Sequence, residues 1–565
     1  MRIREKNPEK AMNLINDPWI PVLRRKGGER EYIRPFEITD SIDKNPYLLL
    51  DAPRPDFNGA LIQFLIGIIQ TVMMPEDNEE WLNRFEEPPS GKELQEAMQD
   101  VAKYFNLDGD RPLFMQDFTL AEGSEVEIAG LFIEAPGANT IKNNTDHFIK
   151  RAGIQKVCPA CAATALFVLQ TNAPSGGQGH RTSLRGGGPL TTLPIPNGRN
   201  QKHDTLWHRI WLSVLEKGDF NLANTGCNPS LKKPEVKFPW INDTKTSEIK
   251  GNAVPGKEIH PSQIYWAMPR RILLKNGLPE NGECDVCNRQ GNAFYTSYIT
   301  KNYGVEYGDG IVHPLSPYYQ DKDNNLLPQH PQPGGFTYRY WPNFAYSNAK
   351  ENPRAFVIWK AEGRLKNLKE GKTEIEISIY TFGYDMDNMK ARCWYEAQIP
   401  FFLVAENRDF FENTAKVFSE SAKMIARNTS QAVRNAWFSA DASVRGDFSF
   451  IENDFWQSTE KYYIQALQQC IENKYIDYNE EFFGFVKTWL SDLNKVALKI
   501  FDQQSEQVPM DAGKFKETDK NKAPRLFKAR KDLISFNYSK KVKEVLHLPI
   551  PPKENGKTKK EKVHA

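Results

Sequence analysis

Two Cys-x-x-Cys pairs, far apart in the chain, constrain its fold more than any other feature. The pairs are Cys158-Pro-Ala-Cys161 and Cys284-Asp-Val-Cys287, and residues 162–283 lie between them. Each pair presents two thiolates to one edge of a tetrahedron, and two pairs complete a four-cysteine zinc site. Four thiolates leave no position for water, so we expect a structural Zn²⁺ that ties distant segments together and supplies no Lewis-acid chemistry.

Other interpretations of the cysteines stay open at this point. The pairs are alternatively unrelated buried cysteines, or one of them is a redox motif. The chain has seven cysteines, an odd number, and no apolar leader at its start, which argues against a disulfide framework. Cys227, Cys393 and Cys470 are isolated, and we expect them to be packing residues.

The chain has 565 residues, which is too long for one hydrophobic core, so we expect two or three domains. Short strand-like runs and helices alternate up to about residue 400, with strands expected at Ile20–Leu23 and Thr373–Tyr380. Helices are expected at Asp56–Met74, ended by Pro75, and at Ala162–Thr171. From Phe401 prolines nearly vanish until Pro509, and apolar residues recur at helical spacing in four segments: Thr414–Arg427, Asp454–Asn473, Glu480–Gln503 and Pro524–Leu546.

The pattern predicts an α+β protein in three parts. Residues 1–400 form a large mixed α/β domain with long loops and the zinc site. Residues 401–548 form an all-α four-helix bundle. Residues 549–565 form a Lys-rich tail without apolar periodicity, which we expect to be disordered.

Charge and hydropathy limit the partners. The net charge is only +2, so any nucleic-acid contact comes from local patches or from a larger assembly. The longest apolar stretch, Ala60 to Met74, contains Gln63 and Gln70 and is too short to span a bilayer. Without such a span or a leader, we expect a cytoplasmic protein with no membrane partner.

A glycine-rich segment follows the first cysteine pair and ends in Arg185-Gly-Gly-Gly188. Glycines let the backbone approach a ligand closely, and Arg181 and Arg185 add charge and bidentate donors. The segment favours a phosphate cradle or a groove-inserting loop, although such loops are often only tight turns. It lacks the Gly-x₄-Gly-Lys-Ser/Thr pattern of a Walker A loop.

Taken together, these motifs resemble the CasA family, the large subunit of type I-E CRISPR Cascade. The resemblance covers about residues 12–545 and rests on five elements in the family's order. They are Asn13-Leu-Ile-Asn-Asp-Pro-Trp-Ile-Pro-Val22, Cys158 through Ala173-Pro174 with the glycine-rich segment and Leu184-Arg-Gly-Gly-Gly-Pro-Leu-Thr-Thr192, Trp266-Ala-Met-Pro, the second cysteine pair, and His313-Pro-Leu-Ser-Pro317.

The resemblance implies that the protein reads a protospacer-adjacent motif (PAM) in the minor groove of double-stranded target DNA. The family's glycine loop maps to Ser175, Gly176, Gly177 and Gln178, with Ser175 and Gln178 standing where the family's pattern has glycine. The family's lysine finger maps to Asn302 by counting, with Lys301 beside it; a cation suits the groove better. The family's wedge glutamine maps to Asn388, which is otherwise an ordinary β-turn residue.

The resemblance also implies RNA and protein partners. Residues 136–156 resemble a loop that docks near the 5′ end of the guide RNA, with Phe148 as its anchor and Lys150 and Arg151 against phosphates. Other Cascade subunits and a recruited helicase-nuclease are the implied protein partners. Between Lys514 and Lys543 eleven Lys and Arg face three Asp and Glu. Lys528, Arg530 and Lys531 are predicted to form a basic patch that follows a phosphate backbone. The alternative is that these residues only make up a solvent-exposed face of the helix.

No enzyme motif accompanies these features, because the nucleophile-elbow, zincin and Walker patterns are missing from the sequence. We therefore expect no catalytic residues, and the resemblance implies that cleavage belongs to the separate helicase-nuclease. The main alternative is a zinc-stabilised RNA-binding scaffold subunit of a ribonucleoprotein without DNA readout. A metal-dependent hydrolase ranks third, since a closed four-cysteine site is incompatible with it.

Overall fold

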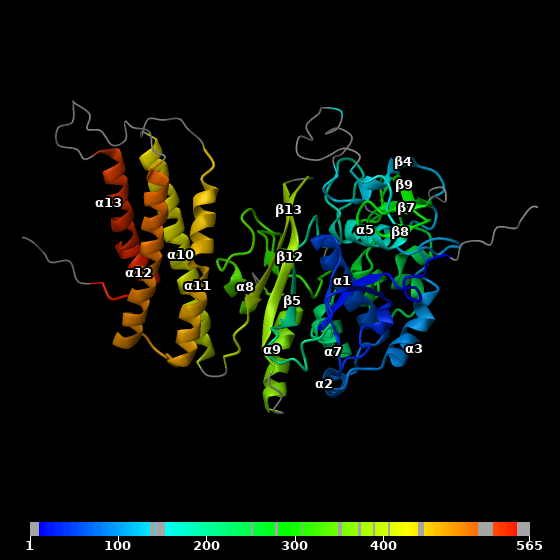
Figure 1. Cartoon of the computed structure of the whole chain (residues 1–565), viewed down its shortest axis with the longest axis horizontal. Coiled ribbons are helices and arrows are strands. Elements are labelled where there is room, and N and C mark those ends of the chain that lie inside the picture. Colours follow the sequence, from blue (N-terminus) through cyan, green and yellow to red (C-terminus); the bar gives the residue numbers. More distant parts are fainter. Residues whose placement is uncertain are drawn as a thin grey trace, which may run out of the picture. The chain divides into compact units, whose positions relative to one another are not determined.

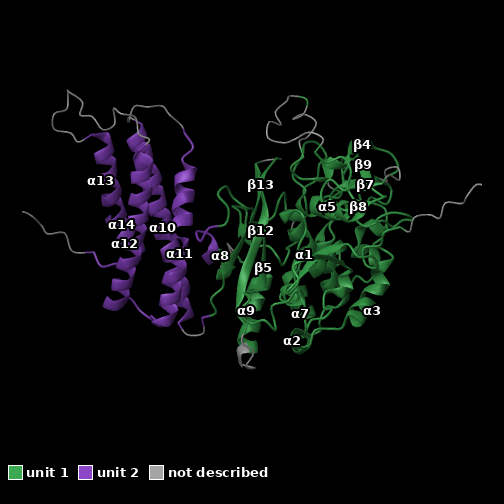
Figure 2. Ribbon diagram, in the orientation of Figure 1, with its two compact units in different colours: residues 1–336, 343–403 green, residues 337–342, 404–565 purple. Residues whose placement is uncertain are grey.

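The computed structural model describes residues 11–135, 142, 153–249, 252–276, 281–308, 310–347, 353–370, 375–387, 390–404, 407–438, 446–506 and 524–550. The chain divides into two compact units (Figure 2). Unit 1 comprises residues 1–336 and 343–403, and unit 2 comprises residues 337–342 and 404–565. Within the described residues, no helix combines the length and apolarity needed to cross a lipid bilayer.

Unit 1 is a mixed α+β structure with small antiparallel sheets rather than one large sheet (Figure 1). Three sheets have three strands each, in the orders β2-β1-β3, β4-β9-β6 and β13-β12-β5. Their bounds are β1 Ile20–Arg24, β2 Arg30–Ile33, β3 Tyr47–Leu50, β4 Ser124–Glu127, β5 Thr191–Pro196, β6 Arg271–Asn276, β9 Tyr295–Lys301, β12 Ile377–Asp387 and β13 Lys390–Pro400. Two short hairpins complete the set: β7 Gly282–Glu283 with β8 Gln290–Gly291, and β10 Tyr318–Gln320 with β11 Leu326–Pro328.

The helices of unit 1 are mostly short, apart from the central helix α1. Their bounds are α1 Pro55–Val72, α2 Asn78–Glu86, α3 Gly91–Ala102, α5 Pro159–Asn172, α6 Leu206–Trp211, α7 Lys217–Ala223, α8 Trp341–Ala345, which runs across the unit boundary, and α9 Phe356–Glu370. The 3₁₀ turns are η1 Pro35–Glu37, η2 Ile128–Leu131, η3 Pro234–Val236, η4 Pro239–Ile241, η5 Gly256–Glu258 and η6 Pro261–Tyr265.

Helix α1 is the centre of the unit 1 core. Pro55 is at its first position, where a missing N–H costs nothing, and residues 59–70 are continuously buried. The ring of Phe64 contacts five aromatic rings at centroid distances of 5.2 to 6.1 Å: Trp19, Phe105, Phe114, Phe167 and Trp266. Gln70, which interrupts the apolar run, exchanges two hydrogen bonds with the backbone of Leu215, at 2.7 and 2.8 Å. The polar interruptions are therefore satisfied inside a core helix.

A buried ion pair fastens α9 to the rest of unit 1. Arg364 is 1% exposed, donates to Glu216, and lies over the ring of Trp81 at 4.0 Å. Lys360 contacts both Glu216 and Asp219. Burial lowers the pKa of Arg364 to about 10, which still leaves the guanidinium charged at neutral pH. Two cations and two carboxylates thus neutralise one another inside the unit.

The long hairpin of β12 and β13 is only partly backed by a third strand. Strand β5 pairs with Ile377–Phe382 alone, so the outer half of the hairpin is a two-stranded ribbon. The Tyr384 hydroxyl donates to Asp56 at the start of α1, at 2.6 Å, and Arg392 pairs with Asp385 across the ribbon. Residues Ile377 to Asp385 are buried except for Tyr380, so the strand is covered on both faces although its sequence alternates.

Unit 2 is helical. Its long helices are α10 Arg408–Trp437, α11 Ser449–Glu472 and α12 Glu480–Ser505, followed by α13 Arg525–Asn537 and α14 Lys540–Val545. Helix α10 packs against α11, α12, α13 and α14. The segment 337–342 adds to this core, because Tyr338 stacks on Tyr463 at 4.3 Å and bonds Thr459 at 2.9 Å.

Most of the expected elements are confirmed, with one correction. The predicted strand at Ile20–Leu23 is β1, and the predicted helices in residues 56–74 and 162–171 are α1 and α5. The single helix expected at Pro524–Leu546 is wrong, because α13 ends at Asn537 and α14 begins at Lys540. Ser539 between them has extended backbone at the N-cap of α14, which interrupts the helical path although its side chain makes no capping hydrogen bond. Apolar spacing alone does not detect such a break.

The Phe64 cluster makes a prediction for stability. Phe64→Ala removes the ring that five others contact, so we expect the free energy of unfolding of unit 1 to fall by about 3–5 kcal/mol. Phe450→Ala is the matched control, because Phe450 is 44% exposed and should change stability by about 0.5 kcal/mol or less. Denaturant unfolding followed by tryptophan fluorescence measures both. Equal effects of the two variants would contradict the central place given to Phe64.

Candidate functional site

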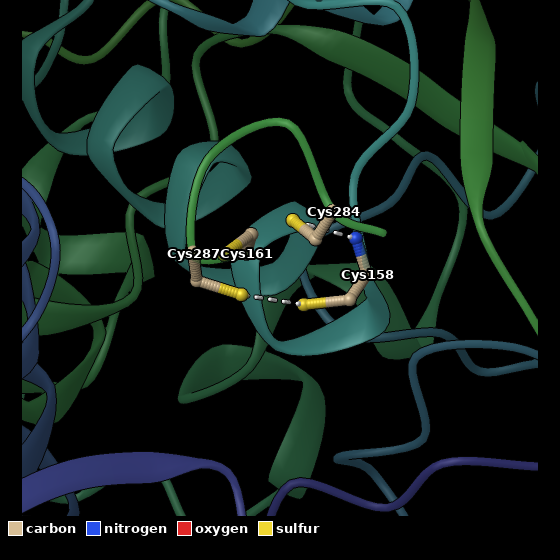
Figure 3. Close-up of side chains that lie close together, drawn as sticks. All are labelled: Cys158, Cys161, Cys284 and Cys287. Carbon is tan, nitrogen blue, oxygen red and sulfur yellow. Dashed lines mark hydrogen bonds between the residues drawn. The ribbon is translucent and has the colours of Figure 1, made fainter. Parts of the chain in front are cut away.

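Four cysteines from two distant segments meet in unit 1 (Figure 3). The sulfur atoms of Cys158, Cys161, Cys284 and Cys287 all lie within 4.8 Å of one another. Cys158 Sγ and Cys287 Sγ are 3.6 Å apart, and all four thiols are free. A tetrahedral zinc with Zn–S bonds of about 2.3 Å places its sulfur ligands roughly 3.8 Å apart. The cluster therefore has the donor set and the size of a closed four-sulfur metal site.

Local backbone structure explains how each pair presents its sulfurs. Cys158 is the N-cap residue of α5, and Cys161 lies in the first turn of that helix. Cys284 and Cys287 lie in the turn between β7 and β8. Asn288 has a positive φ of 59° and closes this turn by donating its N–H to the carbonyl of Cys284 at 2.9 Å. A helix start and a tight hairpin turn thus face each other.

Hydrogen bonds join the two Cys-x-x-Cys segments independently of any metal. The Asp285 carboxylate accepts the backbone N–H groups of Gln155 and Lys156 at 2.7 and 2.8 Å. The backbone N–H of Cys158 donates to Cys284 Sγ at 3.3 Å. Hydrogen bonding, first of all with Cys158, lowers the pKa of Cys284 far below its usual range and that of Cys287 to about 7. Hydrogen bonding within the cluster, together with burial, raises the pKa values of Cys158 and Cys161 well above the usual thiol range. Without a metal, the second pair therefore favours thiolate and the first pair keeps its protons, which a bound metal would displace.

The glycine-rich segment begins where α5 ends. Residues 175–178, the predicted glycine loop, are all exposed. Gly177 has a φ of +94°, a conformation that L side chains rarely adopt, and a Cβ at this position would have no atom within 4 Å. Its backbone is therefore open to a ligand on one side. Gly179 also has a positive φ, of +76°, but a Cβ there would collide with Asn302 at 2.8 Å.

Arg270 holds the base of this loop. Its guanidinium donates to the carbonyl of Pro174, before the loop, and to Nδ1 of His180, after it. The side chain of Gln170 in turn bonds the backbone N–H and C=O of Arg270, at 2.9 and 3.0 Å. Burial, together with the charge of Arg270, lowers the pKa of His180 and so keeps the ring neutral and able to accept. Both ends of the loop are therefore fixed to one side chain.

The end of strand β9 contacts the other side of the loop. Asn302 Nδ2 donates to the carbonyl of Gln178 at 2.9 Å, and the N–H of Tyr303 donates to Gly179 at 2.7 Å. Lys301 is the last residue of β9, and it and Asn302 are exposed. The structure thus brings together the predicted glycine loop and both candidates for the lysine finger, although they are far apart in sequence.

The ribbon of β12 and β13 meets the end of the same segment. A Cβ on Gly188 would lie 2.8 Å from Cβ of Tyr384 and 2.9 Å from Cγ of Met386, so only glycine fits against the ribbon. The last described pair of the hairpin is Asp387 with Lys390. Asn388, the predicted wedge, lies outside the described residues between them.

The remaining candidates lie elsewhere. Phe148, Lys150 and Arg151 fall outside the described residues. In unit 2, Lys528 and Lys531 are exposed on α13, whereas Arg530 makes a bidentate ion pair with Asp502 at 2.8 and 2.9 Å. Two of the three predicted basic-patch residues therefore present unpaired side chains within the described part of unit 2, and the third is already neutralised.

Two sequence-based interpretations need correction or addition. Arg181 and Arg185 do not add surface charge to the loop, because Arg181 pairs with Glu306 at 3.1 Å and Arg185 is 4% exposed. Both arginines serve internal contacts. Arg270, in contrast, was missed by sequence reasoning. No local pattern marks it, since its role depends on a fold that brings β6 beside the loop.

The comparisons with known proteins agree on one family. The family model for CRISPR-associated protein Cse1 matches residues 13–500. The structure of Thermus thermophilus CasA (Cse1) is similar at 17% identity, with a TM-score of 0.63 over 95% of this chain and 100% of that one. Thermobifida fusca Cse1 is similar at 14% identity, with a TM-score of 0.66 over 95% of this chain and 98% of that one.

A chain from a structure described as a CRISPR RNA-guided surveillance complex is similar at 14% identity. Its TM-score is 0.65, over 94% of this chain and 100% of that one. These identities establish a shared fold, and the family model covers most of the chain. The protein therefore belongs to the CRISPR-associated protein Cse1 family.

Proposed function

We propose that this protein is the large subunit of a type I-E CRISPR RNA-guided surveillance complex, and that it binds nucleic acid rather than catalysing a reaction. Membership of the Cse1 family and the likeness to a chain from an RNA-guided surveillance complex support the assembly. The observation that carries the DNA-reading role is the exposed glycine loop, whose base Arg270 holds and whose far side touches Asn302. Base pairing with the guide then reads most of the target, and the protein reads only the PAM.

The loop has the properties that minor-groove readout needs. The groove is narrow and offers a degenerate acceptor pattern, so a slim backbone with N–H donors suits it better than long side chains. Gly177 leaves such a backbone uncovered, and Lys301, next to the loop-bonded Asn302, is an exposed cation that suits the negative potential of the groove. Ser175 and Gln178 add a hydroxyl and an amide at the loop's ends.

Strand separation is assigned to the ribbon. The described strands end at Asp387 and Lys390, and Asn388 lies between them in the sequence. We infer that Asn388 wedges the first base pair beyond the PAM and starts the R-loop. The helicase-nuclease then joins the complex and performs the cleavage.

Other surfaces are assigned to RNA and displaced DNA. Phe148, Lys150 and Arg151 are proposed to dock near the 5′ end of the guide. The exposed lysines 528 and 531 of α13 are proposed to contact a phosphate backbone in a salt-dependent manner. Residues 401–548 are proposed to act as a four-helix bundle domain, and nearly all of the predicted Lys-rich tail, residues 551–565, lies outside the described residues. The protein is expected to work in the cytoplasm.

A structural zinc is proposed for the four-cysteine cluster. The sulfurs of Cys158, Cys161, Cys284 and Cys287 would hold the ion, which adds cross-linking and no open coordination position. Because α5 leads directly from this cluster into the glycine loop, the ion would fix the helix that positions the loop. The alternative function, a zinc-stabilised RNA scaffold without DNA readout, shares this site and differs only at the loop and ribbon.

The metal site is tested by Cys284→Ser. We expect the purified wild-type chain to hold about one zinc per molecule, and the variant to lose most of it because a closed site needs all four thiolates. Cys227→Ser is the matched control, since burial raises the pKa of the Cys227 thiol to about 12 and it lies outside the cluster. Elemental analysis measures the metal. Full zinc content in Cys284→Ser would refute the shared site.

The DNA-reading role is tested by replacing Gly176 and Gly177 together with Asp. The added carboxylates repel phosphate and strain the positive φ of Gly177. We expect R-loop formation by the reconstituted complex on PAM-bearing duplex to fall by at least about 100-fold, while the complex still assembles. Gly218→Asp is the control, because Gly218 is exposed on unit 1 with no atom near its Cβ position. Unchanged R-loop formation by the double variant would favour the RNA-scaffold alternative.

The wedge is tested by Asn388→Ala in the same complex. We expect binding of duplex to persist while strand opening slows by about tenfold or more, since the side chain that splits the first base pair is shortened. Reporter fluorescence from a base analogue placed next to the PAM follows opening directly. A DNA substrate with a mismatch at that position should restore the wild-type rate. Loss of duplex binding together with opening would argue for a PAM-reading residue instead of a wedge.

A further inference from the structure

A small cavity lies in unit 1 beneath the segment that follows the glycine loop. The centre of a water-sized particle can move within about 10 Å³ of it, so it holds one small particle. Its polar lining comes from Gln63 of α1, Gln170 and Thr171 of α5, Ser183, Arg185, Tyr265 of η6 and His313. None of these residues belongs to the cysteine cluster or to the exposed loop of residues 175–178, although Gln170 bonds Arg270 at the base of that loop.

Arg185 places a positive charge in this wall without a carboxylate beside it. Its Nη1 donates to the hydroxyls of Thr191 and Ser316, each at 3.0 Å, and its Nη2 donates to the amide oxygen of Gln63. All three acceptors are neutral, and no described acidic residue forms an ion pair with Arg185. Burial lowers the pKa of Arg185 to about 10, which keeps it protonated at neutral pH. Buried charges are normally paired, so a counter-charge is missing.

Two further donors line the same cavity. The hydroxyl of Tyr265 is buried and makes no hydrogen bond with any described residue. Nδ1 of His313 accepts the N–H of Leu315 at 3.2 Å, so the proton of the neutral ring sits on Nε2. Burial holds the pKa of His313 well below its usual value, and the ring therefore stays neutral. The rings of Tyr265 and His313 are 5.1 Å apart.

We propose that this cavity binds one small monovalent anion, chloride in ordinary salt, between Arg185, Tyr265 and His313. A cavity lined by three donors and one net positive charge favours an anion over a water molecule, which leaves the charge uncompensated. The small space of about 10 Å³ suits a monatomic anion better than phosphate, sulfate or a carboxylate. The anion would fasten the segment around Arg185 to α1 and η6. The inference does not depend on the proposed function.

The test is thermal unfolding of the full chain in sodium chloride or bromide against sodium gluconate, at fixed ionic strength and pH. Halide should raise the unfolding temperature in a saturable way, because a ligand that binds only the folded state stabilises it. Tyr265→Phe, which removes one donor and no charge, should weaken the apparent halide affinity about tenfold. Arg185→Met should abolish the halide dependence.

Tyr463→Phe is the matched control. It removes a buried tyrosine hydroxyl from unit 2, where the hydroxyl donates to Ala415 at 2.8 Å. It should lower the unfolding temperature equally in all salts and leave the halide affinity unchanged. Should Arg185→Met fail to fold, Tyr265→Phe still separates a specific site from a general salt effect.

Crystals grown in bromide give a second readout. An anomalous peak in the cavity within about 3.5 Å of the Arg185 and Tyr265 donors supports the site. A cavity that holds only water under these conditions overturns the proposal. So does a halide dependence that is the same in the wild type, Tyr265→Phe and Tyr463→Phe.

Discussion

Two turns contact each other in unit 1, one at the start of α5 and one between β7 and β8. This contact positions the segments that surround the glycine-rich segment. Cys158 and Cys161 come from the first turn and Cys284 and Cys287 from the second, and the Asp285 carboxylate bridges them through backbone N–H groups. The fixed α5 then delivers the glycine-rich segment at its far end, while the chain after β8 enters β9 and returns to that segment through Asn302. The contact between the two turns therefore positions both segments that hold the glycine loop: α5 before it and the end of β9 beside it.

The glycine-rich segment combines an open part with a tightly packed part. Around Gly177 nothing restricts the outer side of the backbone, whereas Gly179 and Gly188 are glycines because neighbouring atoms leave no room for a Cβ. Arg270 supports the open part from below, and Arg185 anchors the packed part inside the core. The arginines of this region thus shape the loop from inside, and Lys301 at the end of β9 is an exposed cation next to Asn302, which contacts the loop.

Sequence reasoning succeeded where spacing carries the information. The two Cys-x-x-Cys pairs predicted a four-sulfur cluster, and apolar runs predicted α1, α5 and the long helices of unit 2. It failed where tertiary contacts decide. Nothing in Arg185 or its neighbours distinguishes a phosphate-binding arginine from a buried one, and Ser539 interrupts a helix whose apolar spacing continues. Arg270 holds the base of the loop only because the start of β6 lies beside it. The wedge position, Asn388, stays a prediction.

The β12–β13 ribbon is supported unequally along its length, because β5 pairs with only one half of it. Its inner half is paired with β5, while its outer half is held by its own ladder, by the Arg392–Asp385 pair, by the edge-to-face contact of Tyr384 with Trp394 at 4.9 Å and by close packing against Gly188. The Tyr384–Asp56 hydrogen bond joins this ribbon to the first turn of α1. This hydrogen bond therefore joins the outer half of the ribbon to the helix at the centre of the unit 1 core rather than to a loop. Its loss would loosen the outer half of the ribbon from α1 without changing the residues that follow Asp387.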